Sequence, residues 1–221
     1  GSADPYALRR NALGFMQIVL KNGLRLSLSK LISKACALHG NRLEAKPEKV
    51  AADLLQFMKT RLETVLADEG ARNDVVQAVL SVPFDDLLEV RRKSESITAL
   101  SAAKGFNDAL TAFIRPINIV PKETLKTIIP PSVDDMKEHK ITGHEVDRIT
   151  TTLMKEPAEM NLYLKYVAVK DESETSIIDG DYKRAFNSMA GMQETINDYF
   201  EKVLVMDKDD KVRGNRLNMM A

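Results

Sequence analysis

Apolar side chains recur every three or four positions along most of the 221-residue chain, the spacing that places them on one face of an α-helix. The first such stripe covers residues 8–20, and Asn22 and Gly23 end it. Asp4 and Pro5 before it suit the N-cap and first-turn positions of a helix. No stretch alternates apolar and polar residues for long enough to predict a strand. The pattern therefore predicts an all-α protein, a bundle of helices.

Further helices follow along the chain, each bounded by residues that favour helix ends. Pro47 begins a long helix that Gly70 ends, and Asp181 caps another whose apolar stripe runs to Leu204. In chain order, the predicted helices are residues 5–21, 28–39, 47–69, 74–82, 86–100, 106–114, 145–155, 157–169, 182–204 and 208–221.

Two stretches interrupt this helical pattern. Pro116 and Pro121 break it after residue 114, and the proline-rich residues 121–142 predict a linker or an irregular wrap. Residues 170–180 are polar and end in Asp-Gly, which predicts a loop.

The last stretch of the chain, residues 205–221, opens a helix with an acidic first turn and then stops. Asp207 suits the N-cap of this helix and Asp210 its third position, where a carboxylate favours the positive end of the helix dipole. A helix of about three turns with few apolar anchors is marginal without tertiary support. We therefore expect residues 217–220 to pack against the preceding helix, and we expect the chain to be cut short within an unfinished final helix.

Composition narrows the class of protein without indicating an activity. Hydrophobic residues make up 44% and charged residues 29% of the chain, an ordinary globular balance. A single cysteine, Cys36, excludes an internal disulfide and favours a reducing, cytoplasmic location. No apolar run reaches the roughly 20 residues that a membrane-spanning helix needs, so we expect no membrane span.

Charge is balanced over the whole chain but not along it. The 32 basic and 32 acidic residues cancel, which removes the simplest reason to expect a polyanion partner. Residues 1–50 nevertheless carry a net charge of +6, from nine basic and three acidic residues, and the remainder carries −6. A solvated basic face is the ordinary interpretation, and a surface for nucleic acid or another partner is the alternative.

Candidate catalytic and metal-binding groups are sparse. No glycine-rich nucleotide loop or nucleophile motif occurs in the sequence. His139 and His144 are five positions apart with Gly143 between them, which does not suit zinc on one helical face, so we expect a surface loop there. Cys36 lies near His39 without an orienting third group, so we expect it to fill the core. The residues alone describe a helical binding or scaffold module without a catalytic site.

Two segments near the ends of the chain resemble one known family. Residues 4–20, "DPYALRRNALGFMQIVL", are similar to a segment in the C-terminal half of the bacterial glycyl-tRNA synthetase beta subunit. Residues 196–217, "INDYFEKVLVMDKDDKVRGNRL", resemble the signature of that subunit's C-terminal, DALR-type anticodon-binding domain, and residues 74–120 resemble the subunit more loosely. The DALR letters themselves are not kept, since Lys211 and Val212 precede Arg213 where the name has Ala and Leu.

The resemblance implies a role in the ATP-dependent attachment of glycine to tRNA. It predicts a helical segment at residues 1–70 and an anticodon-binding domain at residues 71–221, together an excised C-terminal piece whose last domain is truncated. In the family a separate alpha subunit carries the catalytic site for glycine, ATP and Mg²⁺, so no cofactor or catalytic residue is expected in this chain. The implied partners are glycine tRNA and the alpha subunit, in a heterotetramer. The alternative is a non-catalytic helical interaction or scaffold domain.

The resemblance also suggests which side chains contact tRNA. Every glycine anticodon ends in two cytosines, whose base edges suit carboxylate, arginine and asparagine side chains, while phosphates suit lysine and arginine. The candidates are Lys208, Lys211, Arg213, Asn215, Arg216, Arg9 and Arg10. Structural roles compete with tRNA contact at these positions. Asp209 and Arg213 have the spacing of a helix ion pair, Asn215 and Arg216 could bind a neighbouring helix backbone, and the two N-terminal arginines could dock a preceding domain.

Overall fold

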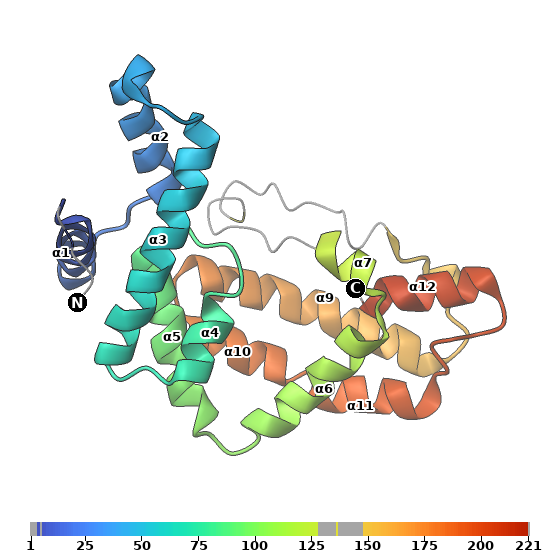
Figure 1. The fold of residues 1–221 in the computed structure, drawn as a ribbon. Helices are drawn as coiled ribbons and strands as arrows, with labels where there is room; N and C mark the ends of the chain where they lie inside the picture. The colour runs from blue at the N-terminus through green and yellow to red at the C-terminus, as the bar shows by residue number, and fades with distance from the viewer. Residues whose placement is uncertain (1–3, 5, 128–135, 137–147, 221) are drawn as a thin grey trace. The chain divides into compact units, whose positions relative to one another are not determined.

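The computed structural model describes residues 4, 6–127, 136 and 148–220, and helices are the only regular structure in this part of the chain. The all-α prediction is therefore confirmed. Contacts divide the chain into two compact units, Gly1–Ala99 and Leu100–Ala221 (Figure 1). Each unit has its own hydrophobic core.

The first unit is built around a long central helix. Its helices are α1 (Leu8–Lys21), α2 (Leu28–His39), η1 (Gly40–Arg42), α3 (Pro47–Asp68), α4 (Asn73–Val79) and α5 (Leu87–Ser101). Both α1 and α2 pack against α3, and α4 packs against its end (Figure 1). Met16, Leu62 and Leu87, from three different helices, are almost completely buried. Burying an apolar side chain of this size stabilises the fold by about 1.5–3 kcal/mol relative to exposing it.

Two successive aspartates join the starts of α2 and α5. The Asp85 carbonyl accepts a hydrogen bond from the Leu28 N–H (2.8 Å), and its carboxylate accepts one from the Ser29 N–H (2.6 Å). The Asp86 carboxylate accepts a hydrogen bond from the Leu88 N–H (2.9 Å). These bonds satisfy backbone groups that a helix start leaves without an internal partner.

The predicted boundary between residues 70 and 71 falls inside this core. Leu66 precedes that position and Val76 follows it, and both belong to one cluster of buried side chains. The contacts divide the chain after Ala99 instead. The extent of the anticodon-binding domain, proposed from the sequence as residues 71–221, stays a prediction.

The second unit packs a bundle of helices around the buried Tyr199. Its elements are α6 (Phe106–Ile119), α7 (Lys122–Thr127), η3 (Thr151–Leu153), α9 (Pro157–Ile178), α10 (Tyr182–Ala190), α11 (Gln193–Lys202) and α12 (Asp210–Met220). Helix α9 packs against both α10 and α11, and α6 packs against α11 and α12 (Figure 1). Leu162, Ile196 and Val203 are buried with Tyr199, and Leu217 and Met220 of α12 pack into the same cluster. None of the helices in the described residues is long and apolar enough to cross a membrane.

Helix α9 runs through residues 170–178, so the predicted loop there is wrong. Ser173 and Ser176 are buried despite being polar, and α9 packs extensively against α10. The Lys170 ammonium also lies 3.9 Å from the Glu174 carboxylate one turn along the helix. Tertiary burial therefore extends a helix that local composition does not favour.

Helix α6 continues past Pro116, although the sequence predicts its end at residue 114. Proline has no N–H to donate to the carbonyl one turn earlier. The Val120 N–H nevertheless donates to the Pro116 carbonyl (3.1 Å), and Ala112 and Val120 are both buried in the core. Packing of the apolar face thus holds the last turn. Helix α7 then lies in the predicted linker, whose residues 128–135 and 137–142 are outside the described residues.

The starts of two predicted helices also differ from the structure. Asp4 is not the N-cap residue of α1, since Ala7, in a left-handed conformation (φ +54°), directly precedes Leu8. The Asp4 carboxylate nevertheless accepts a hydrogen bond from the Arg10 N–H of the first turn (3.5 Å), and the Ala7 N–H donates to the Asp4 carbonyl (3.1 Å). Residues 148–155 were expected to be α-helical and contain only the short 3₁₀ helix η3. Residues 145–147 of that predicted helix lie outside the described residues.

The predicted helix over residues 182–204 is two helices. The Asp181 cap is confirmed, since its carboxylate accepts a hydrogen bond from the Arg184 N–H (2.9 Å). The helix ends at Gly191, where a Cβ atom would lie 3.1 Å from the Ser188 carbonyl oxygen. This tight turn separates α10 from α11, and the apolar stripe continues across it because both helices face the same core.

The first core makes a direct prediction about stability. Replacing Leu62, which is fully buried, by alanine should lower the free energy of unfolding by about 2–5 kcal/mol, because the deletion leaves a cavity. Leu38 is 81% exposed, so Leu38→Ala should change it by less than roughly 0.5 kcal/mol. Urea denaturation followed by circular dichroism measures both values. Equal losses for the two variants would contradict the assigned core.

Candidate nucleic-acid interface

Residues 203–209 connect α11 to α12, and we call them the α11–α12 turn. Val203 and Val205 are buried in the core of the second unit, whereas Leu204 is 72% and Met206 59% exposed. Val203 is extended (φ −117°, ψ 121°), and an extended backbone sends successive side chains to opposite faces. The turn therefore holds two large apolar side chains at the surface.

Asp209 caps α12, and Asp210 is the first residue of the helix, so the prediction that Asp207 is the N-cap and Asp210 the third helical residue is wrong. The Asp209 carboxylate accepts hydrogen bonds from the N–H groups of Lys211 (2.9 Å) and Val212 (3.4 Å). These are the second and third residues of the helix, whose N–H groups have no partner within it. The Asp207 carboxylate instead accepts a hydrogen bond from the Asp209 N–H (2.9 Å), inside the turn.

Arg216 of α12 is 3% exposed, and its guanidinium joins three parts of the unit. Its Nε and Nη2 donate to the two carboxylate oxygens of Glu159 on α9, at 2.9 and 3.0 Å. Its Nη1 donates to the Leu204 carbonyl (2.9 Å) and to the Asp207 carboxylate (3.0 Å) in the α11–α12 turn. Four of the five guanidinium N–H groups are therefore bonded within the protein.

Glu159 is completely buried, and sequence reasoning missed it. Its carboxylate also accepts hydrogen bonds from the backbone N–H groups of Lys155 (2.8 Å) and Glu156 (2.9 Å). With Glu156 it forms a capping box at the start of α9. That box is a local signal in the sequence, but nothing local pairs Glu159 with an arginine 57 residues away.

The ionisation of this buried pair follows from its hydrogen bonds. Burial works to raise the pKa of Glu159, but hydrogen bonds from Arg216 and from the N–H groups of Glu156 and Lys155 outweigh it and hold this pKa below its usual range. The hydrogen bond to Glu159 raises the pKa of Arg216. Burial, and the nearby Glu159 carboxylate, raise the pKa of the Tyr199 hydroxyl well above its usual range. The core thus contains an ionised pair beside a neutral phenol.

Two asparagines attach α12 to the segment that precedes α9. Asn215 is 4% exposed, and its Nδ2 donates to the Thr150 carbonyl (3.2 Å) while its Oδ1 accepts a hydrogen bond from the Thr150 N–H (2.7 Å). The Asn218 side chain donates to the Arg148 carbonyl (3.0 Å). Asn215 and Arg216 therefore hold the fold together, the role that competes with tRNA contact at these positions.

The two lysines of the predicted site lie at the surface, unlike the buried Asn215 and Arg216. Lys208 in the turn and Lys211 on α12 are exposed and form no ion pair or side-chain hydrogen bond with the other described residues. Arg213 is half-buried, and its Nη2 pairs with the Asp210 carboxylate (2.5 Å). The expected pair between Arg213 and Asp209 does not form, because the Asp209 carboxylate is occupied by backbone N–H groups.

The remaining two candidates belong to the first unit. Arg9 and Arg10 are exposed on the first turn of α1. The structure thus gathers five of the seven candidate residues on the α11–α12 turn and α12, and leaves two in the other unit. Contact with tRNA stays a prediction for all seven.

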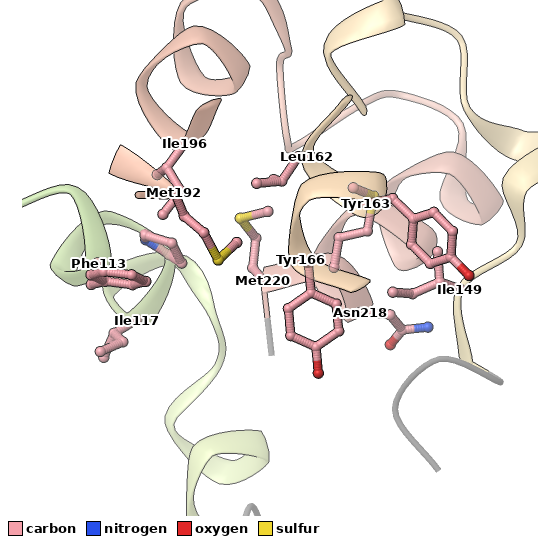
Figure 2. A pocket seen from close by; sticks show the side chains of 12 residues that line it. Phe113, Ile117, Ile149, Leu162, Tyr163, Tyr166, Met192, Ile196, Asn218 and Met220 are labelled. Atoms are coloured by element: carbon pink, nitrogen blue, oxygen red, sulfur yellow. The ribbon is translucent and has the colours of Figure 1, made fainter. Parts of the chain in front are cut away.

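A cavity of about 260 Å³ opens between α6, α9, α11 and α12 (Figure 2). Phe113 and Ile117 of α6 lie across it from Tyr166 of α9, and Met220 of α12 lies between them (Figure 2). The described residues that line it include no histidine, cysteine, lysine or carboxylate side chain. The polar side chains among the lining residues are those of Tyr163, Tyr166 and Asn218, and the others are apolar.

Metal-binding clusters are also missing from the described residues, which contain no group of three histidine, cysteine, aspartate or glutamate side chains suited to an ion. His139 and His144, expected in a surface loop, lie outside these residues. Cys36 is half-buried and packs against the core of the first unit, in keeping with the filling role expected for it.

Comparison with known proteins connects both units to one subunit. Residues 1–81 match the family described as glycyl-tRNA synthetase beta subunit, and residues 135–221 match the family described as DALR anticodon binding domain. The two matches lie in the first and second units respectively. Both families are the ones that the sequence resembles, and their matches leave residues 82–134 between them.

Curated relatives align with the whole chain. A glycine–tRNA ligase beta subunit from Geotalea daltonii is 34% identical over 220 residues, and one from Geotalea uraniireducens is 33% identical over 220 residues. A third, from Yersinia pestis, is 32% identical over 227 residues. Each alignment covers 100% of this chain and 29% of the relative. The chain therefore spans less than a third of the length of the curated relatives it matches.

The buried pair predicts how stability depends on pH. Since the pKa of Glu159 is lower in the folded protein, its stabilisation is fully present above about pH 4.5, the ordinary value, and is lost as the pH falls through the folded pKa. We expect Glu159→Gln to lower the free energy of unfolding by about 3 kcal/mol near neutral pH, because it leaves Arg216 buried without its carboxylate. The difference from wild type should shrink below about pH 4.5.

Urea denaturation at a series of pH values measures this difference. The exposed Glu201 on α11 provides a control, since Glu201→Gln should change the free energy of unfolding little at any of these values. A difference between wild type and Glu159→Gln that stays constant down to acid pH would show that Glu159 is not ionised in the folded protein.

Proposed function

Because this chain belongs to the glycyl-tRNA synthetase beta subunit family, we propose that its second unit binds the anticodon region of glycine tRNA. The observation that carries the proposal is the match of the DALR anticodon binding domain to residues 135–221. These residues include Glu159, Arg216 and the α11–α12 turn that the pair holds.

In this role the chain acts as a non-catalytic part of a glycine–tRNA ligase. Its partners are glycine tRNA and a separate alpha subunit, which binds glycine, ATP and Mg²⁺ and performs the chemistry in the cytoplasm. The three relatives are all glycine–tRNA ligase beta subunits, which supports this assignment.

Recognition of the anticodon follows from the chemistry of its two cytosines. Each presents an N4 amine and the O2 and N3 acceptors once the loop base is splayed out, and the flanking phosphates attract lysine and arginine. Lys208 and Lys211 suit the phosphates, because they are exposed and lack an intramolecular partner among the described residues. Asn215 and Arg216 are assigned to the supporting structure, since their polar groups are bonded inside the unit.

Filter binding with transcribed tRNA tests the proposed function. We expect the 221-residue chain to bind glycine tRNA about 5- to 150-fold more tightly than variants in which either of the last two anticodon cytosines is replaced by uracil, because each mismatched base costs about 1–3 kcal/mol. A tRNA for another amino acid serves as the matched control. Equal affinity for all of these tRNAs would contradict anticodon binding and favour an interaction or scaffold domain.

A further inference from the structure

We propose that the α11–α12 turn is the element that touches single-stranded RNA, with Glu159 and Arg216 as the positioning residues that fix it. Lys208 and Lys211 meet backbone phosphates, and Leu204 and Met206 lie against the faces of unstacked bases. This inference rests on the proposed function and identifies the surface that performs it.

The charges of the turn favour a polyanion, although its sequence is acidic. Three aspartates lie in the turn and at the start of α12, and each has a partner within the unit. Asp207 is bonded by Arg216, Asp209 by the N–H groups that it caps, and Asp210, which is 86% exposed, by Arg213. Lys208 and Lys211 are exposed and have no such partner among the described residues. The cations are therefore available to a ligand, while each nearby anion is already engaged.

The apolar side chains of the turn fit the bases of such a ligand. Leu204 and Met206 are 72% and 59% exposed, yet they alternate with the buried Val203 and Val205. Val203 and Val205 anchor this backbone to the core, so Leu204 and Met206 are held on the opposite face of the same segment. Leucine and methionine are among the side chains that proteins place between or against nucleobases. A single-stranded segment would cover them while its phosphates reached the lysines.

The buried ion pair explains why the turn keeps this form. Burying two charges carries a desolvation cost that an exposed pair avoids, and a protein with apolar residues in their place is often equally stable. The contribution of a buried ion pair is therefore the geometry that its directed bonds impose, rather than stability. Here the geometry it sets is that of the turn, because Arg216 Nη1 bonds the Leu204 carbonyl and the Asp207 carboxylate. The Lys155 ammonium, 3.8 Å from Asp207, adds a further tie to the segment before α9.

The lysines are tested by a matched pair of double variants. We expect Lys208→Ala with Lys211→Ala to weaken binding of glycine tRNA about tenfold, and to reduce the slope of log affinity against log salt by about 1.4, since each single-strand phosphate contact contributes about 0.7. Lys104→Ala with Lys183→Ala removes the same charge from exposed positions near the stacked Phe106 and Phe186. This control should change neither quantity appreciably.

The apolar pair is tested by Leu204→Ser with Met206→Ser. We expect a loss of tRNA affinity of about tenfold with an unchanged salt slope, because no phosphate contact is removed. Unchanged tRNA affinity together with lost association to a glycyl-tRNA synthetase alpha subunit would assign the turn to a protein partner and overturn the proposal. Unchanged affinity in both double variants would overturn it as well.

The positioning role of Glu159 and Arg216 is tested through the side chains that are assigned to RNA contact. Glu159→Gln with Arg216→Met removes the buried charges while a side-chain oxygen remains for the Lys155 and Glu156 N–H groups. In protein shown to be folded by circular dichroism, we expect faster amide hydrogen exchange in the turn and about tenfold weaker tRNA binding. Added to a variant in which Lys208 and Lys211 are alanine and Leu204 and Met206 are serine, the change should cause no further loss, because it acts through those residues. An additive loss would overturn the positioning role.

These results separate the inference from the function on which it rests. If wild-type chain prefers glycine tRNA with an intact anticodon and the variants of the turn bind equally well, the proposed function stands and the assigned surface is wrong. If wild-type chain shows no preference between tRNAs, the proposed function itself fails.

Discussion

The buried pair between Glu159 and Arg216 determines how the second unit is organised. One guanidinium reaches α9 through both oxygens of a carboxylate and reaches the α11–α12 turn through the Leu204 carbonyl and Asp207. Helix α9, the α11–α12 turn and α12 therefore share a single group whose bonds have defined directions. Apolar contacts alone would tolerate small shifts between these segments, whereas losing one of the directed bonds leaves a charge unpaired in the core.

That constraint also explains the unusual surface around the turn. The turn and the start of α12 hold three aspartates, but each carboxylate has a hydrogen-bond or ion-pair partner within the unit, whereas Lys208 and Lys211 are exposed and have none among the described residues. Net charge is thus a poor guide to what this surface attracts. The local electrostatic field depends on which charged side chains are paired within the unit, and not on the balance of 32 basic and 32 acidic residues over the whole chain.

Sequence patterns predicted the helices whose ends have strong local signals. Pro47, Gly70 and Asp181 each mark a helix end close to the predicted position, because proline, glycine and aspartate act on the backbone next to them. The continuation of α9 through polar residues, and of α6 past Pro116, depends on packing against other helices, which local patterns do not report. The site divides in the same way. Its exposed lysines could be proposed from the motif, but Glu159 became visible only when the fold placed it beside Arg216.

The motif at residues 213–217 therefore carries two kinds of information. Its arginines and asparagine have the chemistry that reads cytosine edges, and a sequence argument naturally assigns them to RNA. In the folded unit Asn215 bonds the Thr150 backbone and Arg216 bonds Glu159, so these side chains specify the position of α12. To read a base, these polar groups would have to leave the partners that they bond within the unit. Under the proposed function, selectivity for glycine tRNA is assigned to surfaces that this framework positions, and the α11–α12 turn is the one whose backbone Arg216 bonds directly.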